Sequence, residues 1–207
     1  ITAIEYPLVS TATGAIQGCA NTDLRGGALK FYNGLLYAGV TCAPLYAYDA
    51  NDPDNPPNNQ LRSYVFSYNP TTAAWNPAPV AEIDLTYGRG FISGGILPAA
   101  WNAWTLDSDG VIDDADFLPQ QPFGQRGRPQ PLLSDIEFDE FGYMILGIMD
   151  RTGHQSGNDN GNAGSGPVEG VSGGDTLRLT PDNQTIPSSW TLENNGSDGT
   201  NTGAAGN

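Results

Sequence analysis

Short apolar runs separated by Gly, Pro and Asn recur along the chain, and helical periodicity is almost absent. Residues 28–32 (ALKFY) lead into Asn33-Gly34 and then into residues 35–40 (LLYAGV). Asn-Gly between two apolar runs is the strongest short-range hairpin signal, because both residues tolerate the positive φ of a type I′ turn. The pattern therefore predicts a β-hairpin over residues 28–40.

The same design returns in the second half of the chain. Residues 135–139 (DIEFD), a turn at 140–142 (EFG) and residues 143–148 (YMILGI) predict a second hairpin. Each predicted second strand has a glycine five residues after its turn glycine, at Gly39 and Gly147. A glycine inside a strand indicates that a neighbouring backbone or side chain approaches closely.

Two further strand pairs complete the pattern. Residues 61–68 and 73–75 are joined by a Pro-bearing turn, and residues 175–179 are followed by residues 190–192. In the first pair Tyr64, Phe66 and Tyr68 alternate, so they share one face.

Imperfectly repeated four-stranded units with aromatic anchors are typical of β-propeller blades, at roughly 40–50 residues per blade. We therefore expect an all-β fold, a β-propeller-like array of short antiparallel sheets with long acidic loops. The alternative is a β-sandwich. Residues 1–207 are expected to form a single domain, and its exposed sheet edges call for a partner or for more chain.

Loops and ends are polar and rich in small residues. The segments 157–174 and 194–207 are dominated by Gly, Asn and Ser, and we expect both to be flexible. The chain opens at Ile1 and stops within a small-residue run, so we expect it to be a fragment of a longer chain.

Composition excludes two classes of partner. The 207 residues include 23 acidic and only 8 basic ones, for a formal net charge of −15. Nucleic acid and anionic membranes need clustered Lys and Arg, so neither is expected as a partner. No run of about 18 apolar residues is present, so no membrane insertion is expected either.

The two cysteines bear on the compartment. Cys19 and Cys42 are an even pair and predict one disulfide, which is typical of extracellular proteins, and we expect extracellular or cell-surface localisation. The alternative is two buried free thiols in a cytosolic protein. Asn183 and Asn195 begin N-x-[ST] sequons and are candidate glycosylation sites.

Seven segments in one order resemble a known family. They are residues 39–42, 64–70, 88–90, 101–104, 131–139, 146–155 and 190–196. Together they resemble the large propeller-like region of bacterial secreted or cell-surface proteins that often carry SdrD-B/Cna-B-type repeats. The resemblance implies a structural, adhesive or assembly role at the cell surface, with other copies of the chain or the rest of a longer parent chain as partners. It brings no catalytic motif.

The sharpest local motif is an acidic loop after Trp104. With Gly110 at the sixth position of a calcium loop, carboxylates fall at positions three, five, nine and twelve. These are Asp107, Asp109, Asp113 and Asp116. Thr105 departs from the pattern, because position one normally holds a carboxylate. The loop is therefore either a Ca²⁺ site or a plain acidic turn.

Other candidate chemistry is sparse. His154 is the only histidine, and Ser156 is too close in sequence to be its nucleophile. Asp135 and Glu137 alternate on one strand face about 7 Å apart, which suits either a solvent-facing row or an inverting glycosidase pair. We therefore expect a non-enzymatic extracellular structural or adhesion module, with the repeating subunit of a surface filament or sheath as one form of it. The alternatives are a carbohydrate-binding or glycan-cleaving module acting on surface glycans, and a calcium-rigidified spacer.

Overall fold

The computed structural model describes residues 19, 23–47, 61–92, 97–98, 100–106, 125–156, 169–183 and 187–192. Within them the chain forms strands β1 to β15 and one short helix, α1. Most strand pairs are antiparallel, and the exceptions are two short parallel pairs. The all-β class predicted from the sequence is thus confirmed.

Five strands form the first sheet, in the order β1-β2-β4-β5, with β6 paired to another part of β4. Their bounds are Leu24–Tyr32 for β1, Leu35–Cys42 for β2, Arg62–Asn69 for β4, Ala74–Trp75 for β5 and Ala81–Asp84 for β6. Between β1 and β2, φ is 46° at Asn33 and 81° at Gly34. Both residues have the positive φ of a type I′ turn, so the predicted hairpin is confirmed.

Four strands form the second sheet, in the order β11-β12-β14-β15. Their bounds are Pro131–Phe138 for β11, Met144–Asp150 for β12, Asp175–Pro181 for β14 and Trp190–Leu192 for β15. In the turn between β11 and β12, Gly142 has a φ of 82°. The Asp139 carboxylate accepts hydrogen bonds of 2.9 Å from the backbone N–H groups of Phe141 and Tyr143 and so fixes this turn. The second predicted hairpin is also confirmed.

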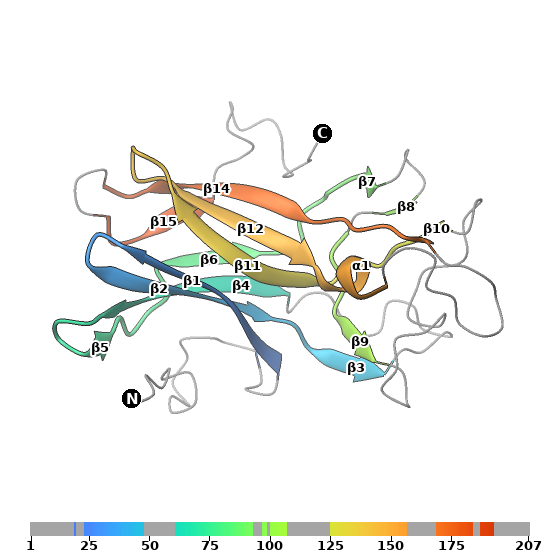
Figure 1. The fold of residues 1–207 in the computed structure, drawn as a ribbon, viewed down its shortest axis with the longest axis horizontal. Helices are drawn as coiled ribbons and strands as arrows, with labels where there is room; N and C mark the ends of the chain where they lie inside the picture. Colours follow the sequence, from blue (N-terminus) through green and yellow to red (C-terminus); the bar gives the residue numbers. More distant parts are fainter. Residues whose placement is uncertain are drawn as a thin grey trace.

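Smaller elements lie at one end of the two sheets (Figure 1). The strand β3 (Leu45–Ala47) pairs in parallel with β9 (Trp104–Leu106), and β10 (Gln125–Arg126) pairs in parallel with β13 (Glu169–Gly170). The strands β7 (Phe91–Ile92) and β8 (Leu97–Pro98) form an antiparallel pair. The helix α1 (Arg151–Ser156) directly follows β12.

Both sheets follow one plan. In each, the first strand carries an extra residue at a bulge, Gly27 in β1 and Ser134 in β11. The residue after each bulge pairs with the glycine of the second strand, Gly39 or Gly147. The bulge and the glycine together define equivalent positions in the two sheets.

The register of strand pairing extends this equivalence to the other positions of the first three strands in each sheet. Counted from the bulge, Leu29 corresponds to Ile136 and Phe31 to Phe138. The same register in the second and third strands matches Leu36 with Met144, Ala38 with Leu146, Phe66 with Leu177 and Tyr68 with Leu179. The two sheets are therefore two versions of one antiparallel unit.

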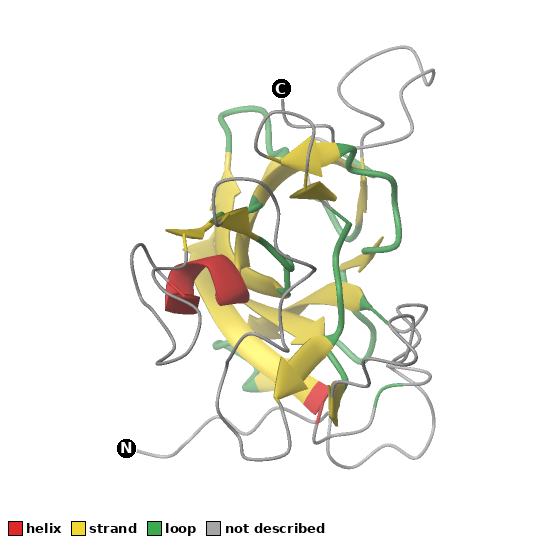
Figure 2. Ribbon diagram, turned by 90° about the vertical axis from the view of Figure 1, so that its right-hand side faces the viewer, coloured by secondary structure: helices red, strands yellow, loops and turns green. Residues whose placement is uncertain are grey.

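The sheets face each other and approach at both edges. Strand β1 runs beside β11 (Figure 1), and the backbone N–H of Leu133 donates to Oγ1 of Thr41 at 2.9 Å. At the other edge, the N–H of Trp190 donates to the Val80 carbonyl at 2.8 Å. Seen along the long axis, the strands lie around one interior (Figure 2).

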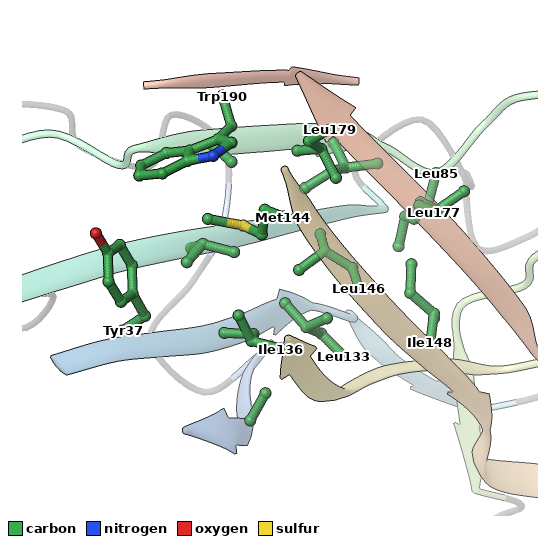
Figure 3. Packing of buried hydrophobic residues seen from close by; sticks show 14 of the residues in the cluster. Tyr37, Leu85, Leu133, Ile136, Met144, Leu146, Ile148, Leu177, Leu179 and Trp190 are labelled. Carbon is green, nitrogen blue, oxygen red and sulfur yellow. The ribbon is translucent and has the colours of Figure 1, made fainter. Parts of the chain in front are cut away.

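One hydrophobic core fills this interior (Figure 3). The second sheet supplies Leu133, Ile136, Met144, Leu146, Ile148, Leu177, Leu179 and Trp190, which are all at most 5% exposed. These residues alternate with outward-facing ones along β12 and β14, as a half-buried strand requires. Burying each such side chain contributes about 1.5–3 kcal/mol.

The propeller form of the prediction is not confirmed, since the described residues hold two larger sheets facing each other across one core. Residues 169–174, at the end of the segment predicted to be flexible, are described, and Gly173 among them is buried. Its N–H donates to Asp150 at 3.0 Å and its carbonyl accepts from Arg89 at 2.6 Å, which ties this stretch to the fold. Residues 157–168 and 194–207 lie outside the described residues.

Candidate functional site

An apolar surface lies over β1, β2, β4 and β5 on the side of the first sheet that points away from the second, and the β6 part of that side carries Glu82 and Asp84. We call the apolar surface the outer apolar face. Its members come from β1, β2, β4 and β5, and cross-strand pairing places them on one side: Leu29, Phe31, Leu36, Ala38, Val40, Cys42, Tyr64, Phe66, Tyr68 and Trp75. The predicted row of Tyr64, Phe66 and Tyr68 is part of this face. Sequence alternation therefore predicted the part of the face that β4 contributes.

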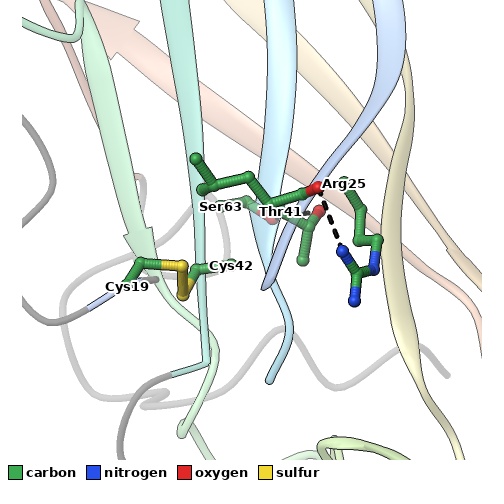
Figure 4. The surroundings of a disulfide bond; sticks show 6 residues. Cys19, Arg25, Thr41, Cys42 and Ser63 are labelled. Atoms are coloured by element: carbon green, nitrogen blue, oxygen red, sulfur yellow. Dashed lines mark hydrogen bonds between the residues drawn. A yellow bond between two sulfur atoms is a disulfide. The ribbon is translucent and has the colours of Figure 1, made fainter. Parts of the chain in front are cut away.

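One end of the outer apolar face is closed by a disulfide (Figure 4). Cys19 is bonded to Cys42, with their Cα atoms 6.0 Å apart, so the predicted disulfide is confirmed. Beneath it Val40, Tyr64 and Phe66 are at most 7% exposed. Burial raises the pKa of Tyr64 to about 12, so its hydroxyl stays neutral at physiological pH.

The other end of the face, near the hairpin turn, is open. Leu29 is 66% exposed and Phe31 is 61% exposed, and both lie on β1. Their cross-strand partners Ala38 and Leu36 are half-buried. Adjacent large apolar side chains in solvent mark an interaction surface more often than scattered single ones do.

The second sheet buries the equivalent positions. Ile136, Met144 and Leu146 correspond to Leu29, Leu36 and Ala38, and each is 0% exposed. At its open end, with Leu29 and Phe31, the same side of the repeated unit is thus surface in the first sheet and core in the second.

The outer face of the second sheet is polar. The acidic residues of β11 alternate there as expected, with Asp135 and Glu137 exposed. Glu137 forms an ion pair with Lys30, the only lysine, from β1. Asp139 holds the turn and lies 3.6 Å from the guanidinium of Arg178. The described geometry therefore gives Glu137 and Asp139 structural partners and places this acidic row in solvent.

Two of the four tryptophans serve packing. Trp101 and Trp190 are 2% and 5% exposed. The indole N–H of Trp190 donates to the Gly142 carbonyl at 2.9 Å. Trp75 and Trp104 are only half-buried, so they are the tryptophans able to stack on a ligand. Trp75 also packs beside Tyr68, with ring centroids 5.2 Å apart.

Trp104 is surrounded by positive charge in an acidic protein. The guanidinium carbons of Arg25 and Arg151 lie 5.0 and 4.5 Å from its ring centroid. Its indole N–H donates to the Pro131 carbonyl at 2.9 Å. These contacts fix the start of β9 against the second sheet.

A buried polar network, which the sequence did not reveal, links Tyr87, Arg89 and Trp101 to β14. The Arg89 guanidinium stacks over Trp101 at 3.7 Å and pairs with Asp175 at 3.3 Å. The Tyr87 hydroxyl donates to Asp175 at 2.8 Å, and the indole of Trp101 donates to that hydroxyl at 3.2 Å. Burial raises the pKa of Tyr87 and lowers that of Arg89. The network ties Tyr87, Arg89 and Trp101 to Asp175 at the start of β14.

Asp150 is the second buried anchor. It is 0% exposed, and its carboxylate accepts 3.0 Å hydrogen bonds from the N–H groups of Gln130, Thr152 and Gly173. Burial raises the pKa of Asp150, and the donated N–H groups oppose that rise. The next helix carries His154, which is exposed. The carboxylate joins three chain segments and acts structurally.

Several predicted sites fall outside the described residues. These are Asp107, Asp109, Asp113 and Asp116 of the predicted calcium loop, and the sequon residue Asn195. Asn183 is described and exposed. In the described part of the chain, no group of three or more His, Cys, Asp or Glu residues is arranged to hold a metal ion.

Comparison with known proteins adds no family. No protein-family model, curated protein or solved structure matches the chain. Among the residues that the structure describes, no helix has the length and apolar character needed to cross a membrane. The outer apolar face is therefore the feature on which a function is argued.

Proposed function

We propose that this chain is a non-enzymatic extracellular structural module that assembles through the outer apolar face of its first sheet. The observation that carries the proposal is the exposure of Leu29 and Phe31, whose equivalents in the second sheet are Ile136, which is fully buried, and Phe138, which packs against the core. Surface of this kind costs free energy in water until another surface covers it. The disulfide is compatible with an extracellular protein.

The experiment removes this surface and leaves the core intact. Wild type and the Leu29→Ser/Phe31→Ser double variant are compared by light scattering and electron microscopy over a range of concentrations. We expect wild type to form oligomers and the double variant to stay monomeric, with equal melting temperatures below the concentration of assembly. Because both side chains are more than 60% exposed, their loss should not affect folding.

A matched control is available in the same chain. Phe91 and Phe141 are 64% and 61% exposed and lie away from the outer apolar face. The Phe91→Ser/Phe141→Ser variant removes the same kind of side chain and assembles like wild type. A wild type that stays monomeric at high concentration, or equal loss of assembly in both variants, contradicts the proposal.

The prediction of a propeller-like repeat architecture is part of the same proposal. Two versions of one antiparallel unit, sharing a bulge and a strand glycine, support a repeat architecture that further units of a parent chain extend. The resemblance to bacterial surface proteins adds the expectation of display at the cell surface. The intact mass of the native protein tests this, because it reports the termini, the disulfide and any glycan on Asn183 or Asn195 together.

Calcium binding is proposed at Asp107, Asp109, Asp113 and Asp116. Their spacing around Gly110 supports it. Ca²⁺ that binds the folded chain raises its melting temperature, and EDTA reverses the rise. A melting temperature that is the same with EDTA and with Ca²⁺ removes calcium from the proposal.

One observation favours glycan binding as a second function. Trp75 and Tyr68 lie next to each other on the outer apolar face and are both half-buried, an arrangement suited to stacking on a sugar ring. A glycan array with wild type and Trp75→Ala decides the point. Glycan binding by wild type that is lost in Trp75→Ala supports this second function, and no binding to any glycan contradicts it.

A further inference from the structure

The two sheets pack front to back. The side of the second sheet that faces the core carries Ile136 and Leu146. In the first sheet the equivalent residues, Leu29 and Ala38, lie on the outer apolar face, away from the core. A two-fold arrangement would have buried the same side of both sheets. The internal contact instead joins two different sides of one unit, and such a contact is heterologous.

A front-to-back contact leaves one face of each kind outside the contact between the sheets. On the outer apolar face, the end with Leu29 and Phe31 is exposed, whereas Val40, Tyr64 and Phe66 are buried. The outer apolar face of the first sheet corresponds to the side that the second sheet buries. The outer face of the second sheet corresponds to the side that the first sheet buries, so Gly147 and Ile145 occupy the places of Gly39 and Tyr37. The molecule thus presents in solvent the counterparts of the two sides that it joins in its interior. One is the apolar open end of the first sheet, and the other is the side of the second sheet where Ile145 is half-buried and Asp135 and Glu137 are exposed.

We infer that the chain assembles head to tail, the open end of the outer apolar face of one copy, at Leu29 and Phe31, packing on the outer face of the second sheet of the next copy. The inference rests on the proposed function and names its partner surface. Inside the chain, Phe138 packs on Tyr37 with ring centroids 4.9 Å apart. The equivalent pair between copies is Phe31 of one copy and Ile145 of the next.

The charges where β1 meets β11 agree with head-to-tail assembly. Inside the chain, Lys30 of the first sheet pairs with Glu137 of the second. These two residues occupy equivalent positions counted from the bulges, with opposite charge. Units stacked in one direction therefore alternate Lys and Glu along the line where their first strands meet.

The contact between copies is weaker than the internal one. Inside the chain, Leu133 lies over Gly39, where an added Cβ would be only 2.7 Å from Cδ2 of Leu133. The residue equivalent to Leu133 on the outer apolar face is Gly26, which has no side chain to insert over Gly147. Assembly is therefore expected to depend on concentration. A heterologous contact that does not close into a ring continues into a filament.

Cross-linking between single-cysteine variants tests the direction. Full-length Phe31→Cys and Ile145→Cys proteins, with the native disulfide intact, are mixed and treated with a short bis-maleimide. The mixture gives several-fold more covalent dimer than either variant alone. A mixture of Phe141→Cys with Ile145→Cys is the control, because Phe141 is as exposed as Phe31 and lies off the face.

The outcomes separate this inference from the proposed function. If Phe31→Cys alone cross-links as well as the mixture, the contact is two-fold, which overturns the head-to-tail inference and keeps assembly through the face. If oligomers form but the mixture does not exceed the Phe141 control, another surface makes the contact and the inference fails. If wild type is monomeric by light scattering and nothing cross-links, both fail.

Discussion

Leu29 in the first sheet and Ile136 in the second hold the same place, two residues after a bulge in a first strand, yet one is 66% exposed and the other fully buried. Strand pairing decided which side of the sheet each residue occupies. What packs on that side decided whether it became core. An apolar residue in a strand therefore identifies a face, and only the neighbouring layer shows whether that face is interior.

The largest expected effect is the difference in stability between alanine variants of Ile136 and Leu29. Ile136→Ala should lower the free energy of unfolding by about 3–4 kcal/mol, because it leaves a cavity among fully buried neighbours. Leu29→Ala at the equivalent position should cost less than about 0.5 kcal/mol. Urea unfolding of both variants below the concentration of assembly measures the difference. Similar losses in the two variants would mean that the face of Leu29 is covered within the monomer.

The second prediction concerns the disulfide, which is attached to the first sheet and not to the second. It closes a loop of 23 residues onto the first sheet. Replacing Cys19 and Cys42 with Ala should lower stability by about 3 kcal/mol through the entropy of the unfolded chain. Hydrogen exchange should show greater loss of protection in β2 and β4 than in β12 and β14. Uniform loss in both sheets would show that they unfold as one unit.

The equivalent glycines give a smaller contrast. A Cβ on Gly39 would lie 2.7 Å from Cδ2 of Leu133 and 2.9 Å from Cβ of Ala28, whereas one on Gly147 would first meet Cβ of Asp135 at 3.2 Å. Gly39→Ala should destabilise by about 1–3 kcal/mol through overpacking, and Gly147→Ala by less. Thermal melts compare the two. Equal melting temperatures would contradict the tight packing of Leu133 on the first sheet.

The smallest effect appears only in alkali. Tyr37 on the inner side of the first sheet stands where the second has Ile145, and burial, assisted by Tyr32, raises its pKa to about 12. An unfolded tyrosine ionises near pH 10, so the folded state holds this proton more tightly. Stability is therefore unaffected below about pH 10 and falls as pH rises from about 10 to about 12. Tyr37→Phe should flatten this fall in urea unfolding measured across that range, and an unchanged slope would exclude Tyr37 as its source.

Local signals in the sequence predicted much of the fold. Asn33-Gly34 and the segment ending at Gly142 predicted both hairpin turns, since positive φ restricts the residues allowed there. The cysteine count predicted the disulfide, and alternation predicted the aromatic row of β4. The alignment of the two hairpins from their turn glycines anticipated the common plan of the two sheets.

The buried polar anchors were beyond sequence reasoning. Arg89 and Asp175 are 86 residues apart, and nothing near either one indicates that they meet. Asp150 ends β12, and folding surrounds it with backbone N–H groups from three segments. Such partners are brought together by chain topology, which no local pattern encodes.

By itself, the sequence determined the all-β class, the two hairpins, the covalent link and the aromatic side of β4, because backbone dihedrals, side-chain alternation and cysteine pairing act over short distances. The tertiary structure decided that the two units stack front to back, and so which of two equivalent apolar sides is core and which faces solvent. That choice depends on contacts between residues about a hundred positions apart. The surface proposed for assembly is identified only by comparing the equivalent positions of the two sheets.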